Sequence, residues 1–171
     1  HDNAKLSALF DGAPLRNQLF SMLAGVLAMT LSSLGYIALY RYVEGYSTVC
    51  GTMLLVSLVM LMVPGTAHHV FCGAVEWFYI RMGRTEESRQ AITEFFKKTS
   101  STMLVCYVGF AVFLVTLFVV VVSGMTGLPR WACIFNAFPL FILMFPFRIV
   151  GSMNIASSAM FLGLFVTLCA I

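Results

Sequence analysis

The sequence is organised around residues 63–77, Val-Pro-Gly-Thr-Ala-His-His-Val-Phe-Cys-Gly-Ala-Val-Glu-Trp. This stretch combines the helix-breaking pair Pro64-Gly65 with two adjacent histidines and the carboxylate of Glu76. Apolar sequence precedes it, and both a proline and ionisable side chains are costly inside a membrane helix. The stretch therefore bears on how the chain crosses a membrane and on where its polar groups lie.

The rest of the chain is too apolar for a soluble domain. Of its 171 residues, 60% are hydrophobic and 10% are charged, whereas soluble domains carry about 25% charged residues. Several runs without charge reach the roughly 17–25 residues that cross a hydrocarbon core, and none alternates as barrel strands do. The pattern therefore predicts membrane-spanning helices. The charge-free runs cover residues 17–40, 45–75, 99–129, 131–147 and 149–171.

The second of these runs is too long for one straight crossing. Residues 45–80, with one charge among them, would extend over ~54 Å as a helix. Two arrangements are open: one long helix kinked at Pro64, or two crossings joined by a turn there. Residues 66–80 alone would span only ~22 Å, which is short of the core. A single helix also divides the basic residues eight to two between the two sides, which the positive-inside rule favours.

The predicted fold is an all-α, polytopic transmembrane helical bundle with five spans in the cell membrane. Residues 1–16 form an exposed N-terminal arm, and residues 17–171 form a single bundle. The arm and loop 81–98 carry most basic residues, so both are predicted to be cytoplasmic. The sequence starts at His1, which leaves open a sixth, N-terminal span upstream. The five predicted spans cover residues 17–40, 47–80 with its kink at Pro64, 99–122, 130–147 and 150–171.

Loop 81–98 is the long polar segment between predicted spans. Thr85 has the side chain of a helix N-cap, and two glutamates follow it where the helix dipole favours anions. Ile92, Phe95 and Phe96 then recur at helical spacing. We predict a short amphipathic cytoplasmic helix that runs into the third span. Two roles stay open, a solvated connector and a docking surface for anionic lipid or a partner.

Helical spacing places four residues of the second span on one stripe, because steps of three, four and seven residues return to the same face. They are Gly65, His69, Gly73 and Glu76, and His68 lies about 100° away from His69. The two glycines leave room beside the imidazole for a cavity or for a closely packed helix.

Two interpretations of these polar side chains stay open. In the first, they hold a ligand or substrate, because an ionisable residue inside a span is a functional candidate. In the second they are structural: a histidine bonds carbonyls freed by Pro64, and Glu76 pairs with Arg81 or Arg84. A metal site is not predicted, since adjacent histidines point apart and no HExxH motif is present.

Two asparagines extend the candidate set. Asn136 lies near Pro139 in the fourth predicted span, and Asn154 lies in the fifth. Each is expected either to hydrogen-bond a neighbouring helix or to contact a ligand. The candidate ligand-binding residues are therefore His68, His69, Glu76, Asn136 and Asn154.

Several classes of protein lack their signatures in this sequence. No Walker loop, GxSxG motif or dinucleotide-binding glycine pattern is present, and no lysine lies inside a predicted span. The net charge of +3 is too small and dispersed for a nucleic-acid partner. The five cysteines show no zinc-like spacing. We predict no cofactor, and the expected partners are membrane lipids, a hydrophobic small molecule and further copies of the chain.

Several short motifs carry a resemblance to a known family. They are Gly65-x-x-His68 within a span, Leu128-Pro129-Arg130-Trp131 followed by Asn136, and Asn154 before a tail rich in Phe and Leu. From Pro64 to Ile171 the chain resembles a family of small bacterial multi-pass membrane proteins whose function is uncharacterised. Family members tend to have adjacent Asn-Pro where this chain has Asn136-Ala-Phe-Pro139, and an additional N-terminal span. The resemblance implies a helical bundle and no particular activity.

A second likeness is local. A histidine followed by Glu-Trp-Phe and a short polar loop is similar to emopamil-binding, sterol-isomerase-type membrane proteins. In that family, histidine and glutamate side chains inside the membrane move protons on a sterol. Here His69 and Glu76 are seven residues apart rather than four.

The leading hypothesis is a non-enzymatic membrane protein that binds a hydrophobic small molecule or lipid in an intramembrane cavity. One alternative is an intramembrane, isomerase-like enzyme that uses His69 and Glu76 as acid and base. The other is a transporter or channel subunit, which would need a polar path to both membrane faces.

Overall fold

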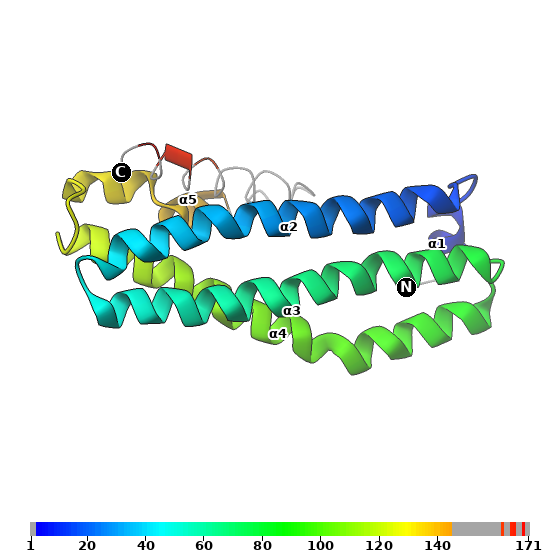
Figure 1. Cartoon of the computed structure of the whole chain (residues 1–171). Helices are drawn as coiled ribbons and strands as arrows, with labels where there is room; N and C mark the ends of the chain where they lie inside the picture. The colour runs from blue at the N-terminus through cyan, green and yellow to red at the C-terminus, as the bar shows by residue number, and fades with distance from the viewer. Residues whose placement is uncertain (1–2, 145–161, 163–164, 167–168, 170–171) are drawn as a thin grey trace. The chain divides into compact units, whose positions relative to one another are not determined.

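The structure is a computed structural model that describes residues 3–144, 162, 165–166 and 169. Within these residues every regular element is helical and no strand is present, so the all-α prediction is confirmed for them. Helices α2, α3 and α4 are long and apolar enough to cross a membrane. The elements are α1 (Asn3–Leu9), α2 (Leu15–Glu44), α3 (Thr48–Arg81), α4 (Glu86–Val122), the 3₁₀ helix η1 (Arg130–Phe135) and α5 (Ala137–Met144) (Figure 1).

The chain forms two compact units, and each of the three long helices contributes to both. The first unit consists of His1–Ser32 and Met60–Tyr107. It holds α1 with the first part of α2, the second part of α3 and the first part of α4. The second unit consists of Ser33–Val59 and Val108–Ile171, which include η1 and α5.

Helix α3 passes through Pro64 without a break. Its 34 residues extend over ~51 Å at 1.5 Å per residue. A proline inside a helix removes one backbone hydrogen bond and crowds the preceding turn, and the long apolar sequence on both sides supports the helix across this defect. This is the single-helix arrangement that the length argument favoured.

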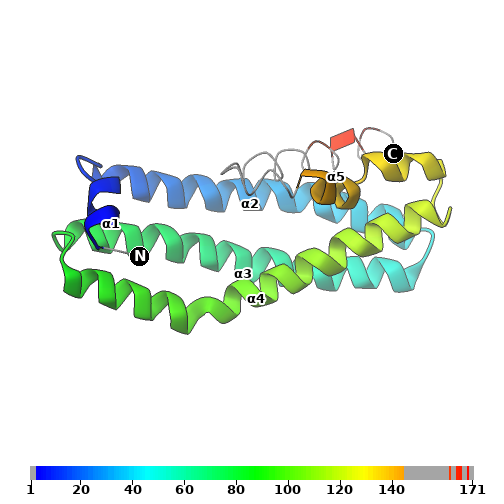
Figure 2. The same ribbon diagram turned by 180° about the vertical axis from the view of Figure 1, so that it is seen from behind.

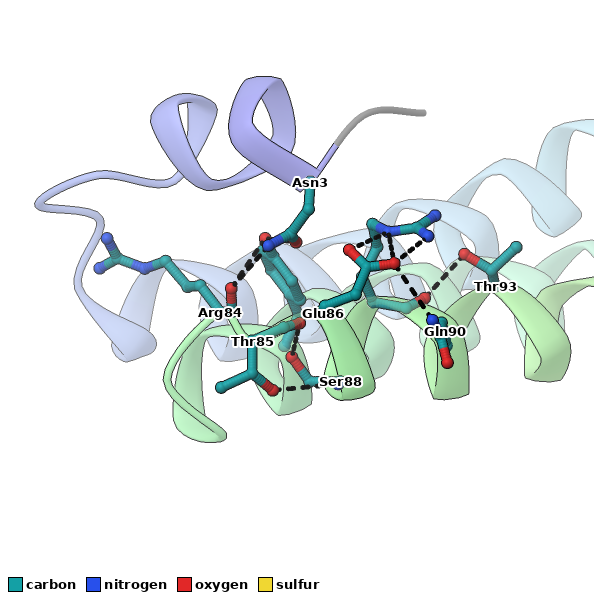
Figure 3. A network of polar contacts seen from close by, with 9 residues as sticks. Asn3, Arg84, Thr85, Glu86, Ser88, Gln90 and Thr93 are labelled. Carbon is teal, nitrogen blue, oxygen red and sulfur yellow. Dashed lines mark hydrogen bonds and ion pairs between the residues drawn. The ribbon is translucent and has the colours of Figure 1, made fainter.

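The turn between α3 and α4 lies in the first unit. Gly83 and Arg84 adopt positive φ angles of 79° and 59°, a left-handed conformation that ends many helices. The backbone N–H of Arg84 donates to the carbonyl of Tyr79 at 3.0 Å. Thr85 then caps α4, because its Oγ1 accepts the backbone N–H of Ser88 at 3.2 Å (Figure 3).

Helix α1 docks on this turn. The side chain of Asn3 donates to the carbonyl of Arg84 at 3.2 Å (Figure 3), and it accepts the hydroxyl of Tyr79 at 2.7 Å. Tyr79 is fully buried, and its ring packs edge-to-face on Phe10 with the centroids 6.1 Å apart. The carboxylate of Asp11 pairs with the Arg84 guanidinium at 3.0 Å. The segment predicted as an exposed arm thus contains a helix with specific contacts.

Helix α4 is continuous over 37 residues. The short amphipathic helix expected before the third span is not a separate element, since its residues form the first turns of α4. Polar residues at the junction do not interrupt the helix because their hydroxyls donate to carbonyls three or four residues earlier. These hydroxyls belong to Thr99, Ser100 and Thr102.

The second unit packs its parts of α2, α3 and α4 around aliphatic and aromatic side chains. Tyr36 and Phe113 meet edge-to-face with ring centroids 4.9 Å apart. At the start of α3, a Cβ on Gly51 would lie 2.8 Å from the backbone Cα of Glu44, so only glycine allows this tight connection. The buried side chains include Leu39, Val43, Leu54, Phe113, Leu117, Val120 and Val121.

The segment predicted as the fourth span is interrupted in the second unit. Between η1 and α5, Asn136 adopts an extended conformation with φ −67° and ψ 151°. Its Oδ1 accepts the backbone N–H of Phe138 at 3.2 Å, which caps α5. Pro139 falls in the first turn of α5, where a helix does not need the missing N–H. The predicted fifth span lies almost wholly outside the described residues.

Replacing Tyr79 by phenylalanine is expected to loosen α1. The variant keeps the buried ring but removes the hydroxyl that donates to Asn3, at a cost of roughly 1 kcal/mol. Amide hydrogen exchange of residues 3–9 should then accelerate about fivefold, since 1 kcal/mol changes an equilibrium by that factor. The matched control is Tyr107→Phe, at an exposed position of α4. Equal exchange in both variants would contradict the docking.

Candidate functional site

Helix α3 meets α2 in the first unit through the predicted glycine stripe. A Cβ on Gly73 would lie 2.1 Å from Cγ of Met22 and 3.3 Å from the backbone oxygen of Gln18. A Cβ on Gly65 would lie 3.2 Å from the methyl of Met29. Contact residues with higher numbers on α2 thus meet residues with lower numbers on α3, so the two helices are antiparallel neighbours here (Figure 1, Figure 2). We call this contact the α2–α3 seam.

His69 lies on the same stripe, between these two glycines. A Cβ on Gly25 of α2 would lie 1.7 Å from both Cδ2 and Nε2 of the imidazole. The ring therefore occupies the space that any side chain at position 25 would fill. The remainder of His69 is exposed. Of the two environments expected beside this histidine, the structure has a closely packed helix.

His68 belongs to a different face of α3 and meets α4. Its Nδ1 lies 3.5 Å from the hydroxyl of Thr102, and its ring centroid lies 5.9 Å from that of Phe96. One turn along, Phe71 packs edge-to-face on Phe95 at 5.4 Å. The two adjacent imidazoles thus contact different helices, as a rotation of about 100° between neighbouring residues requires.

Glu76 continues the stripe one turn beyond Gly73 and is partly buried. Its carboxylate forms no ion pair with any residue that the structure describes. Arg84, one of the two partners considered from the sequence, pairs with Asp11 instead. No described contact joins Glu76 to His69, so their use as an acid/base pair stays a prediction. Within the described ranges, no three His, Cys, Asp or Glu side chains form a metal-binding group.

Gln18 was missed by the sequence reasoning. It is 8% exposed, and its Oε1 is buried without a hydrogen-bond partner. The positions of α2 that contact α3 are 18, 22, 25 and 29, which repeat at helical spacing. A polar residue on the same stripe as these small and flexible residues is the sequence signal that could have revealed the burial of Gln18. Gln18 lies in the α2–α3 seam beside Gly73, on the side toward Glu76.

An apolar groove of about 220 Å³ separates parts of α3 and α4 in the first unit. Every residue that lines it is apolar, and two of them are alanines, whose small side chains leave the space open. We call it the α3–α4 groove. Its lining residues are Ala74, Val75, Phe78 and Met82 from α3, and Ala91, Ile92 and Phe95 from α4.

The candidate Asn136 does not belong to the first unit. Asn136 lies in the second unit, is 1% exposed, and uses its side-chain oxygen to cap α5. Nearby, α5, η1 and the end of α4 line a second apolar hollow of about 490 Å³. Asn154 lies outside the described residues. The structure therefore gives Asn136 a local structural role.

A model for a family of unknown function (DUF6796) matches residues 10–171. The chain belongs to this family. The expected membership of an uncharacterised family is thereby confirmed, and the match includes the first predicted span, where the resemblance was only loose. No curated protein matches the chain, and no solved structure does.

Some of the charged side chains at the polar end of α4 form ion pairs within residues 3–144, and others do not. Arg89 donates to both carboxylate oxygens of Glu86, with Nε at 3.0 and 2.9 Å. This hydrogen bonding holds the pKa of Glu86 below its usual value. By contrast, Arg81 and Glu87 have no ion-pair partner among the residues that the structure covers.

The Gly25–His69 contact predicts a coupling between the two positions. Gly25→Ala would push the exposed imidazole out of the seam, and because the end of this side chain can turn into open space we expect a loss of no more than about 1 kcal/mol in unfolding free energy. In a His69→Ala background the same change should cost little, because the space is empty. A double-mutant cycle measured by denaturant unfolding in micelles gives this coupling. Additive losses would contradict the contact.

The buried amide of Gln18 predicts a stabilising substitution. Gln18→Leu removes an oxygen that has no hydrogen-bond partner, so the unfolding free energy should rise by roughly 1 kcal/mol. The control is Gln90→Leu, at an exposed position of α4, which should change stability by less than about 0.5 kcal/mol. A loss of stability in the Gln18 variant would mean that the amide has a polar partner in the seam.

Proposed function

We propose that the protein is a multi-pass protein of the cell membrane that binds a lipid or another hydrophobic small molecule in the α3–α4 groove. Three helices of sufficient length and hydropathy support the membrane location. The proposed topology has five spans, with residues 130–147, interrupted at Asn136, and residues 150–171 as the last two. The excess of Lys and Arg on one side favours a cytoplasmic α3–α4 turn.

The observation that carries this proposal is the groove itself. Its volume of about 220 Å³ is lined by seven side chains without a single polar group. Exposed side chains form its rim, with Phe78 at 53% and Met82 at 54%. Because its α4 side belongs to the predicted cytoplasmic segment 81–98, a hydrophobic molecule would enter from the side at the cytoplasmic boundary of the bilayer. A molecule that moves from bilayer hydrocarbon into the groove gains little from the hydrophobic effect, so its binding would rest on close packing against the lining side chains.

We propose binding rather than catalysis because the groove contains no acid, base or nucleophile. At the inner end of the groove, His68 lies seven residues before the lining residue Val75 on the same face of α3, beyond the Phe71–Phe95 contact. A polar end of the ligand would therefore meet His68 at the inner end or charged residues at the turn. The other candidates, His69, Glu76, Asn136 and Asn154, stay predictions on which the groove does not depend.

Filling the groove tests this function. Ala91→Trp places a large ring among the lining residues and should displace the bound hydrophobic molecule. We expect the amount of photoactivatable fatty acid cross-linked to α3 to fall roughly tenfold, the equivalent of 1.4 kcal/mol. Cross-linked peptides identified by mass spectrometry give this amount.

The matched control is Ala111→Trp, which makes the same substitution at an exposed position of the same helix. Both variants should keep the circular dichroism spectrum and the elution volume of the wild type. If cross-linking to α3 is equal in the two variants, the groove is not a binding site.

A further inference from the structure

We propose that the ligand of the α3–α4 groove is an aminophospholipid, which carries both a phosphate and a primary ammonium in its head group. One acyl chain would lie in the groove, the phosphate on Arg81 and the ammonium on Glu87. This inference rests on the proposed function and adds the chemical class of the ligand.

The size of the groove favours an acyl chain. Its volume of about 220 Å³ is below the roughly 300–1,000 Å³ of pockets that enclose a whole small molecule. An open, narrow and wholly apolar groove instead suits one flexible hydrocarbon chain whose head group stays outside. The nearby α3–α4 turn, with its charged residues, provides a polar boundary for that head group.

Two charged residues lie on the open edge of the groove at the end near the turn. On α3, Arg81 follows the lining residue Ala74 by seven residues, which returns to the same edge of the helix. On α4, Glu87 precedes the lining residue Ala91 by four residues and shares its edge. The two helices are antiparallel, so the edge of α3 that carries Ala74 and the edge of α4 that carries Ala91 lie on the same side of the groove. A cation, Arg81, and an anion, Glu87, therefore flank the groove on that side.

These two side chains are available to a ligand. Both are exposed, and in the described part of the chain neither forms an ion pair. Three neighbouring basic residues are already paired: Arg84 with Asp11, Arg89 with Glu86, and Lys98 with Glu94.

The chemistry of this pair selects the head group. A guanidinium binds phosphate oxygens through two parallel hydrogen bonds, so Arg81 would hold any phospholipid. A carboxylate accepts hydrogen bonds from a primary ammonium, whereas the quaternary ammonium of phosphatidylcholine has no N–H, and phosphatidylglycerol has no cation. Glu87 would therefore favour phosphatidylethanolamine over both.

Lipid competition tests the assignment. The delipidated protein is mixed in micelles with equal amounts of phosphatidylethanolamine, phosphatidylcholine and phosphatidylglycerol that have the same acyl chains. Native mass spectrometry then measures the retained lipids. We expect phosphatidylethanolamine to be preferred by about threefold to fivefold, the contribution of one exposed ion pair. Glu87→Gln should abolish this preference, and Arg81→Gln should lower retention of all three lipids.

Matched controls isolate the two charges. Glu94→Gln changes a carboxylate on the same edge of α4, seven residues farther along, and should leave the preference intact. Arg41→Gln, in the last turn of α2, should leave total retention intact. A wild-type protein that prefers phosphatidylglycerol, or a Glu87→Gln variant that keeps the wild-type preference, would overturn the inference.

Ala91→Trp separates this inference from the proposed function. If it displaces all three lipids while Glu87→Gln changes nothing, the groove binds lipid without selecting the head group. If it displaces none of them, the groove is not the binding site, and the proposed function fails together with the inference.

Discussion

The first unit depends on the close approach of α2 to α3. Helices surrounded by lipid gain little from hydrophobic burial against each other, so they associate through tight packing at small residues. Here Gly25 on one helix and Gly65 and Gly73 on the other let the backbones approach, and His69 fills the space opposite Gly25. Along residues 69–76 this face of α3 is occupied by α2, and the opposite face with its larger aromatic residues remains for α4. The groove exists because that second contact is made by large side chains interrupted by alanines.

The polar end of the first unit fixes the mouth of the groove. The left-handed residues Gly83 and Arg84 reverse the chain within a few residues, and Thr85 starts α4 at once. The buried Tyr79 joins this turn to α1 through Asn3, so an N-terminal helix braces the connection from outside. A short, braced turn keeps the ends of α3 and α4 close, whereas the helices can separate around the alanines farther along. This is an arrangement in which an apolar groove ends directly beside charged residues.

The sequence predicted well those features that are set by local or periodic patterns. The lengths of the runs without charge predicted the long apolar helices. The ~22 Å length of residues 66–80 as a helix favoured a helix that continues through Pro64. Helical spacing predicted the stripe that includes His69. Features that depend on which helices meet were not predictable. Nothing local distinguishes Gly25 from other small residues of α2, or shows that Gln18 is buried. The break at Asn136 was missed because its apolar surroundings match a continuous span, whereas its side chain can cap a new helix.

The arrangement of polar groups on α3 also explains why binding is the simpler function. General acid/base catalysis requires two titratable groups within reach of one substrate atom. Adjacent imidazoles are rotated by about 100° on a helix, and here one contacts Phe96 on α4 while the other contacts Gly25 on α2. The stripe with His69 and Glu76 faces the seam, and the groove lies on the other contact face of α3. A molecule in the groove would therefore be separated from that stripe by the helix itself, and would meet apolar side chains along its length and charge only at the turn.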